Sequence, residues 1–137
     1  MTSRRNAISV EIHPEAHFVL FRLQGVVYGK ELLDITERTY ATLSEPWRFN
    51  RLFDIRQFIN VLQFEDFAAL AEQWPKLAGR VQPTRAAIVT DDPVRIARAE
   101  SFTRVLPNIT ARTFGTMEAA EAWLAEDVPA MVRAPHG

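Results

Sequence analysis

The chain has 137 residues, no cysteine and a formal net charge of −1. Without cysteine there are no disulfides, thiol nucleophiles or cysteine-ligated metals, and the near-zero charge offers no field for collecting nucleic acid or an anionic membrane. With 47% hydrophobic residues and no apolar run near the roughly 20 residues of a membrane helix, the sequence predicts one cytoplasmic domain over residues 7–126, with loose termini at 1–6 and 127–137.

Two strands begin the chain. Residues 8–13 alternate apolar and polar side chains with the two-residue period of a half-buried strand, and residues 17–25 repeat this pattern after a short turn. Because the connection is so short, we expect an antiparallel hairpin. Over residues 28–43 the apolar side chains recur at helical spacing instead, which predicts a helix that Pro46 prevents from continuing.

The remaining elements alternate between strand and helix. Strands are expected at 51–56, 86–90 and 109–114, and helices at 64–74, 93–105 and 116–124. Pro75 is expected to end the first of these helices, because proline lacks the amide donor. Asp92 followed by Pro93 is typical of a helix start, with an aspartate cap and proline at the first helical position.

The predicted order is therefore ββαβαβαβα. Repeated strand–helix units favour right-handed crossovers, so we predict a single α/β domain with a mixed, mostly parallel five-stranded sheet and one antiparallel edge strand. Each of the first three strands carries polar residues at every second position: Ser9, Glu11 and His13, then Arg22 and Gln24, then Asp54 and Arg56. A sheet covered on both faces would show continuous apolar strands. We therefore expect the helices mainly on one face, with part of the other open to solvent or a partner.

Two segments are similar to those of bacterial SpoIIAA-like proteins. They are the strand at 51–56 (RLFDIR) after the first helix, and the closing segment 114–124 with its Met-Glu-Ala-Ala-Glu-Ala-Trp-Leu helix. Together with the order of elements, the resemblance covers about residues 8–125. It implies a fold related to STAS domains, the anti-sigma-factor antagonists, and more loosely to lipid-carrying Sec14-type domains.

The chain departs from the antagonists at one place. Those proteins carry a phosphorylatable serine at the start of the helix after the central strand, a stretch that corresponds here to about residues 56–67. No serine or threonine occurs anywhere in residues 45–83. Since a phosphate needs a hydroxyl to attach to, we expect no serine-phosphorylation switch at this position.

Candidate polar site residues lie at the carboxyl ends of the strands, where open α/β sheets bind ligands. These ends fall near Tyr28, Asp54, Arg56 and Asp91. Asp54 and Arg56 share a strand face and could orient a polar group, although a solvated ion pair of little energetic weight is the alternative. Asp91 and Asp92 form an acidic pair, which helix capping explains more simply.

Metal and cofactor sites are not expected. His13 and His17 flank a turn, and two ligands at that spacing fall short of the three or four that zinc needs. His136 lies in the terminal segment. No glycine-rich phosphate loop and no serine elbow is present, so no catalytic residue can be named and the chain is not expected to be an enzyme.

The segment between the third strand and the second long helix is apolar where loops are ordinarily polar. Phe58, Val61, Leu62 and Phe64 lie in or beside this loop, and most aromatic side chains of the middle third are expected to be ordinary core. An apolar loop at this position can line the mouth of a site for a nonpolar ligand, or form a contact between two copies of the chain.

Two functions follow from these observations. The first is a non-catalytic STAS-like interaction or regulatory module that binds a protein partner, or itself as a homodimer, through the open sheet face and the apolar loop. The alternative is a small carrier or sensor of a nonpolar, lipid-like ligand. A closed core favours the module, whereas an apolar cavity of a few hundred Å³ favours the carrier.

Overall fold

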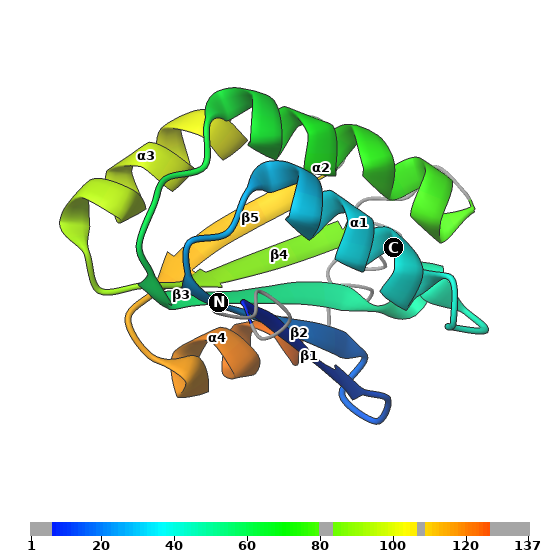
Figure 1. Cartoon of the computed structure of the whole chain (residues 1–137). Helices are drawn as coiled ribbons and strands as arrows, with labels where there is room; N and C mark the ends of the chain where they lie inside the picture. Colours follow the sequence, from blue (N-terminus) through cyan, green and yellow to red (C-terminus); the bar gives the residue numbers. More distant parts are fainter. Residues whose placement is uncertain (1–6, 80–83, 107–108, 127–137) are drawn as a thin grey trace.

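The computed structural model describes residues 7–79, 84–106 and 109–126, and within them the chain forms five strands and four helices (Figure 1). The strands are β1 (Ile8–His13), β2 (Phe18–Gly25), β3 (Asn50–Phe58), β4 (Thr84–Val89) and β5 (Ile109–Phe114). The helices are α1 (Gly29–Tyr40), α2 (Phe64–Ala78), α3 (Pro93–Thr103) and α4 (Met117–Leu124), with a short 3₁₀ turn at Pro46–Arg48. The predicted order of elements is confirmed.

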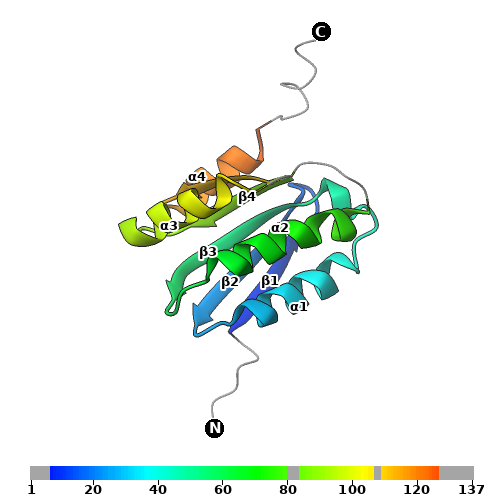
Figure 2. The same ribbon diagram turned by 90° about the horizontal axis from the view of Figure 1, so that it is seen from above.

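The strands lie in the sheet in the order in which they occur in the chain, β1-β2-β3-β4-β5. β1 pairs antiparallel with β2, and every later pair is parallel. Because each parallel crossover steps to the next strand in the same direction, right-handed connections bring α1, α2 and α3 to one face. Figures 1 and 2 show these three helices over the same side of the sheet, with α4 below it. The predicted mixed α/β sheet with helices mainly on one face is confirmed.

The hydrophobic core is divided by the sheet into two unequal parts. The larger part fills the space between the sheet and helices α1 to α3, and it includes Phe21, Leu32 and Trp74. The smaller part lies under α4, where Leu52 and Trp123 pack together. Alternate strand residues point to opposite faces, so one strand supplies side chains to both cores.

Part of the α4 face is polar, as predicted. α4 packs over β3, β4 and β5, while β1 and β2 present charged side chains at the other end of the same face. Arg22 of β2 and Glu11 of β1 retain 33% and 53% side-chain exposure. This region, which α4 leaves uncovered and which we call the open polar face, is defined by the exposed or partly exposed side chains of Glu11, Arg22, Gln24, Arg56 and Gln57, together with the buried carboxylate of Asp54 that binds Arg22 and Arg56.

Pro75 does not end α2, contrary to the prediction. A proline removes its own amide donor and crowds the preceding turn, but the residues after it can still donate, and α2 continues to Ala78. The helix ends at Gly79, whose φ of 77° lies in the left-handed region that glycine adopts without strain. α1 and α3 are shorter than predicted, ending at Tyr40 and Thr103.

Two further expectations concern the ends of the chain and the membrane. The termini predicted to be loose, residues 1–6 and 127–137, lie outside the described residues, and the domain boundaries stay a prediction. No helix in the described part of the chain is long and apolar enough to cross a bilayer.

Candidate functional site

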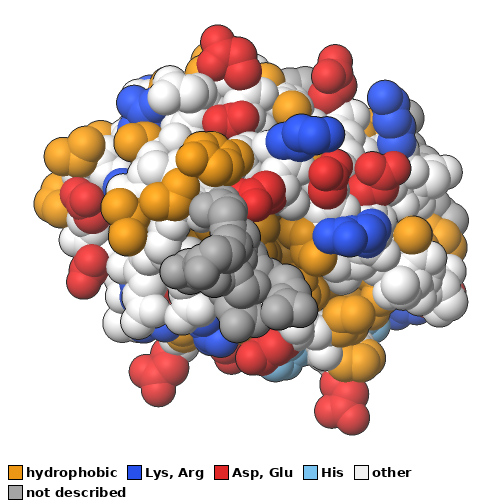
Figure 3. All heavy atoms as spheres, viewed as in Figure 1, with side chains coloured by type: hydrophobic (Ala, Val, Ile, Leu, Met, Phe, Trp, Pro, Cys, Tyr) orange, Lys and Arg blue, Asp and Glu red, His pale blue; other side chains and the backbone are white. Residues whose placement is uncertain are grey.

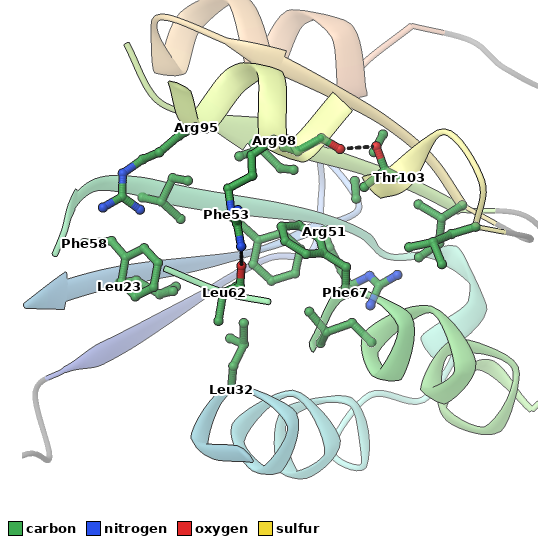
Figure 4. Close-up of a pocket in the computed structure, with 18 of the residues that line it drawn as sticks. Leu23, Leu32, Arg51, Phe53, Phe58, Leu62, Phe67, Arg95, Arg98 and Thr103 are labelled. Carbon is green, nitrogen blue, oxygen red and sulfur yellow. Dashed lines mark hydrogen bonds between the residues drawn. The ribbon is translucent and has the colours of Figure 1, made fainter. Parts of the chain in front are cut away.

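The candidate site is a pocket between α2, α3 and the sheet, with a volume of about 70 Å³ (Figure 4). Its lining is almost entirely apolar. Lining residues come from β2, β3, β4 and β5, from the loop after β3, from α1, α2 and α3, and from Leu106. They include Leu23, Leu32, Phe53, Phe58, Val61, Leu62, Phe67, Ile88, Ala99, Ile109 and Ala111, and the polar members are Arg51, Arg95, Arg98 and Thr103.

Three residues predicted from the apolar loop meet in this pocket. Phe58 and Leu62 are buried, with 6% and 9% exposure, whereas Val61 lines the pocket and is 46% exposed. Ile59 points away and is 69% exposed. The apolar residues of this segment therefore fall into two groups. Phe58 and Leu62 are buried in the core, whereas Ile59 and Val61 are exposed to solvent.

The loop is held in place by hydrogen bonds from residues distant in sequence. The side-chain amide of Asn60 accepts from the Val27 amide and donates to the Val27 carbonyl, both at 2.9 Å. From α3, Arg95 Nη2 donates to the Ile59 carbonyl at 2.9 Å, and Arg98 Nη2 donates to the Leu62 carbonyl at 3.1 Å. These bonds satisfy loop carbonyls that would otherwise need water.

The other two predicted residues of this region do not line the pocket. Phe64 opens α2, is 38% exposed and packs edge-on against Phe102 of α3, with ring centroids 5.5 Å apart. Tyr28 precedes α1 and is 59% exposed. Figure 3 shows hydrophobic side chains gathered where α3 begins and where the chain passes from β3 to α2. Part of the surface around the pocket is therefore apolar, like its wall.

Arg51 is a pocket residue that the sequence interpretation missed. It lies on β3, is 1% exposed, and its Nε, Nη1 and Nη2 have no hydrogen-bond partner in the described structure. Burial lowers its pKa, against the smaller raising effect of Tyr40. The sequence does contain an indication of this placement. Arg51 is two and four residues before Phe53 and Ile55, and alternate residues of a strand share a face, so the pattern predicts that Arg51 points toward the core.

Arg95 and Arg98 were also missed, because nothing in the sequence links α3 to the loop 36 residues earlier. Their guanidinium carbons lie 5.0 Å from the Phe58 centroid and 4.9 Å from the Phe102 centroid. The Nε of Arg98 is buried without a partner among the described residues. These arginines cover aromatic rings at the pocket mouth while they anchor the loop.

Asp54 and Arg56 lie on the opposite side of the sheet from the pocket, in the open polar face. Asp54 Oδ2 accepts from Arg22 Nε at 3.1 Å and from Arg56 Nη2 at 2.9 Å, and Oδ1 accepts from Arg56 Nε at 2.9 Å. Burial alone would raise the pKa of Asp54, but the bonds from Arg56 and Arg22 outweigh it and lower the pKa to about 2. The carboxylate is therefore fully hydrogen-bonded and stays charged at neutral pH.

Asp91 belongs with the polar group rather than with the pocket. It is exposed, and its charge contributes to raising the pKa of Arg56, after the larger effect of the Asp54 hydrogen bond. Its neighbour Asp92 caps α3 by accepting from the Val94 amide at 2.9 Å. The eight predicted residues thus do not form one site: Phe58, Val61 and Leu62 line the pocket, whereas Asp54 and Arg56 lie on the other face of the sheet.

Comparison with known proteins agrees with this fold. The SpoIIAA-like family model matches residues 18–125. A solved structure of an uncharacterised protein of the DUF3478 family with a SpoIIAA-like fold, from Shewanella loihica PV-4, is similar with a TM-score of 0.60 at 18% identity, over 86% of this chain and 92% of that chain. At this identity the likeness shows the fold alone. No curated protein matches the chain.

Proposed function

This chain belongs to the SpoIIAA-like family, and we propose that it is a non-catalytic binding domain that holds a small, mainly apolar molecule in the pocket between α2, α3 and the sheet. The pocket itself carries the proposal. An apolar hollow with a few convergent polar groups is the usual form of a small-molecule site. Here aliphatic and aromatic side chains from every layer on the α1–α3 side line one space.

The chemistry of the lining supports binding rather than catalysis. General acid–base or nucleophilic chemistry needs a group such as histidine, carboxylate or an activated hydroxyl near the substrate. Among the described lining residues the polar groups are three arginines and Thr103, and the Thr103 hydroxyl donates to the Ala99 carbonyl at 2.7 Å. None of these is a group of the kind that such catalysis needs.

The cytoplasmic location expected from the sequence stays a prediction.

The size of the pocket limits what it encloses. At about 70 Å³ it is roughly half the volume of a 150 Å³ cavity that holds benzene. It is also smaller than the few hundred Å³ expected of a carrier for a lipid-sized molecule. We therefore propose that the enclosed part of the ligand has only a few non-hydrogen atoms, and that any longer tail lies along the apolar surface at Val61 and Phe64.

Native mass spectrometry of the gently purified full chain tests this proposal. We expect excess mass on the folded protein that disappears when the same sample is denatured. A bare chain mass under all gentle conditions, together with no binding of added apolar probes, would contradict it.

A pair of variants on α3 provides the matched control. Ala99 is 3% exposed and lines the pocket, whereas Ala97 lies on the exposed side of the same helix. Ala99→Leu adds three carbons into the space and should remove the bound mass. Ala97→Leu adds the same atoms outside and should retain it. If both variants carry the ligand equally, the molecule is bound elsewhere.

A second candidate function is supported by the open polar face. Charged and amide groups of β1, β2 and β3 stand there in an ordered network, with Arg22 and Arg56 fixed by Asp54 and with Gln24 Nε2 donating to Gln57 Oε1 at 2.9 Å. Prearranged polar groups of this kind suit a protein partner. We propose a second copy of the chain as the first partner to test, since a homodimer is the simplest symmetric assembly.

Sedimentation equilibrium over a range of concentrations tests self-association. If copies meet through the open polar face, Gln57→Lys should shift the wild-type dimer to monomer, because it places like charges next to Arg22 and Arg56 across a symmetric contact. Ala97→Lys on the exposed side of α3 makes the same +1 charge change elsewhere and should leave the dimer intact. A wild type that is monomeric at all concentrations would remove self-association from the account.

A further inference from the structure

A buried cation, Arg51, lies in the wall of the pocket and has no hydrogen-bond partner among the described residues. Arg51 lines the space and is 1% exposed, and all three of its side-chain nitrogens lack a partner among the described residues. Its guanidinium carbon lies 5.0 Å from the centroid of the Trp74 ring. The ring attracts the cation through its electron-rich face, but it is not an acceptor for the in-plane N–H groups.

This arrangement is unfavourable in an empty pocket. Buried polar atoms in folded proteins are nearly always hydrogen-bonded, and a buried charge is ordinarily paired. Arginine cannot relieve the cost by losing its proton in the way that a buried lysine does. The guanidinium therefore carries a fork of donors, beside the apolar lining, that are buried as well as unpartnered among the described residues. An anionic group from outside the chain would satisfy them once the guanidinium turns toward the space.

A second arginine shows that this fold supplies a partner elsewhere. Arg85 of β4 is 6% exposed and its guanidinium carbon lies 4.9 Å from the centroid of Trp123, so it repeats the Arg51–Trp74 arrangement on the α4 face. Its Nη1 donates to the Trp123 carbonyl. The two sites have the same pair of residue types and similar burial, and they differ in whether the protein itself provides an acceptor.

We propose that the ligand of the pocket is a small monocarboxylate, with its carboxylate bound to Arg51 and its aliphatic part in the apolar lining. This inference rests on the proposed function and adds the chemical class of the ligand. A planar carboxylate matches the guanidinium fork with two parallel hydrogen bonds. Arg95 and Arg98 already donate to loop carbonyls. Among the described lining residues this leaves Arg51 as the cation whose donors are all unpartnered, which favours a single negative charge over a phosphate.

The volume agrees with this class. A carboxylate and the first carbons of its chain fill a space of about 70 Å³, roughly half that of a benzene-sized cavity. Phe53, Leu62 and Phe67 surround the same space and provide contacts for methylene groups. Figure 4 shows Arg51 among these side chains, drawn from β3, the loop and α2.

Isothermal titration calorimetry with hexanoate and 1-hexanol tests the proposal on full-length protein that has been unfolded and refolded to remove any bound molecule. The two probes share an aliphatic chain and differ in charge. We expect hexanoate to bind wild type at least about tenfold more tightly than 1-hexanol does, because a charge-assisted bidentate pair is worth more than a neutral contact.

Arg51→Met and Arg85→Met separate the two arginines. In Arg51→Met we expect hexanoate affinity to fall at least about tenfold while 1-hexanol affinity stays within about twofold, since methionine keeps the apolar surface and removes the cation. Arg85→Met should change neither affinity by more than about twofold. Retained 1-hexanol binding in Arg51→Met also shows that the variant is folded.

Two outcomes would overturn the proposal, and they are distinguishable. If wild type binds both probes equally and Arg51→Met affects neither, the pocket binds nonpolar molecules without an anionic group; the proposed function stands and this inference fails. If wild type binds neither probe and carries no excess mass in native mass spectrometry, the proposed function fails as well.

Discussion

Two buried arginines, Arg51 and Arg85, lie against tryptophan rings on opposite faces of one sheet, and the protein treats them differently. Arg85 donates to the Trp123 carbonyl, whereas the nitrogens of Arg51 have no acceptor in the described residues. A third charged group, Asp54, is also buried and accepts from two arginines. Among the described residues the buried charges on the α4 face thus have hydrogen-bond partners, whereas the buried charge on the pocket face has none. This difference is the basis for our proposal that a ligand binds on the pocket face.

The largest expected effect is on the compensated side. Asp54→Ala should lower the free energy of unfolding by about 2–3 kcal/mol, because Arg22 and Arg56 lose their shared acceptor, and their partial exposure keeps the loss below that of a fully buried pair. Urea denaturation at neutral pH measures it. Glu11→Ala, which removes an exposed ion pair to Arg22 at 3.6 Å, should change stability by less than about 0.5 kcal/mol. Equal effects of the two variants would contradict this account.

Because of the Asp54 carboxylate, we expect the stability of the protein to depend on pH. The pKa of Asp54 is lowered in the folded state from 3.8 to about 2. A group with a depressed folded pKa contributes stability above its unfolded pKa and loses it as pH falls toward its folded pKa. The stability difference between wild type and Asp54→Asn should therefore shrink by roughly 2 kcal/mol between about pH 6 and about pH 2. A difference that is constant with pH would show that Asp54 is not held in this way.

The two arginines should respond with opposite signs when each is replaced by methionine. Arg85→Met loses a charge-assisted hydrogen bond and should destabilise by about 1–2 kcal/mol. In ligand-free protein Arg51→Met removes an unpaired buried charge at the expense of one cation–π contact, and should stabilise by about 1 kcal/mol. Thermal and urea unfolding of both variants measure this. If Arg51→Met lowers the free energy of unfolding as much as Arg85→Met does, Arg51 already has a hydrogen-bond partner in the ligand-free protein.

A smaller effect tests how the pocket side is assembled. A Cβ at Gly29 would collide with Asp66, whose Oδ2 accepts from the Gln63 amide at 2.8 Å at the start of α2. Gly29→Ala should therefore displace this cap and cost about 1 kcal/mol. Gly115→Ala, at a site with open space around it, should cost less than about 0.5 kcal/mol by the same denaturation assay. If both glycines tolerate alanine, Asp66 moves without loss of the cap.

Much of the fold could be predicted because it rests on local periodicity. The alternation in β1, β2 and β3 predicted both the strands and the open polar face, since residues two apart share a face. Pro75 shows where a local rule fails: the helix continues past it because the following amides still find acceptors, and Gly79 supplies the end. The residue at which a helix ends depends on the backbone hydrogen bonds that its last residues can form, and the amino-acid sequence alone does not show these bonds.

The candidate site was only partly predictable for a different reason. The apolar loop marked Phe58, Val61 and Leu62, but which side chains point inward depends on hydrogen bonds from Val27, Arg95 and other distant residues. Arg51 has the alternation of a core residue, and the sequence cannot show whether a buried cation meets an acceptor. That property depends on the three-dimensional placement of carbonyls and carboxylates, and it distinguishes Arg51 from Arg85.

The most direct test of the central claim is the side-chain Nε–H resonance of Arg51 in ¹H–¹⁵N NMR spectra, assigned by its loss in Arg51→Met. On addition of hexanoate we predict that this resonance moves as its N–H gains a carboxylate acceptor, while the Arg85 Nε–H resonance stays in place and 1-hexanol leaves both nearly unchanged. If hexanoate shifts the resonances of other pocket residues and leaves that of Arg51 unmoved, the carboxylate does not pair with Arg51 and the account is wrong.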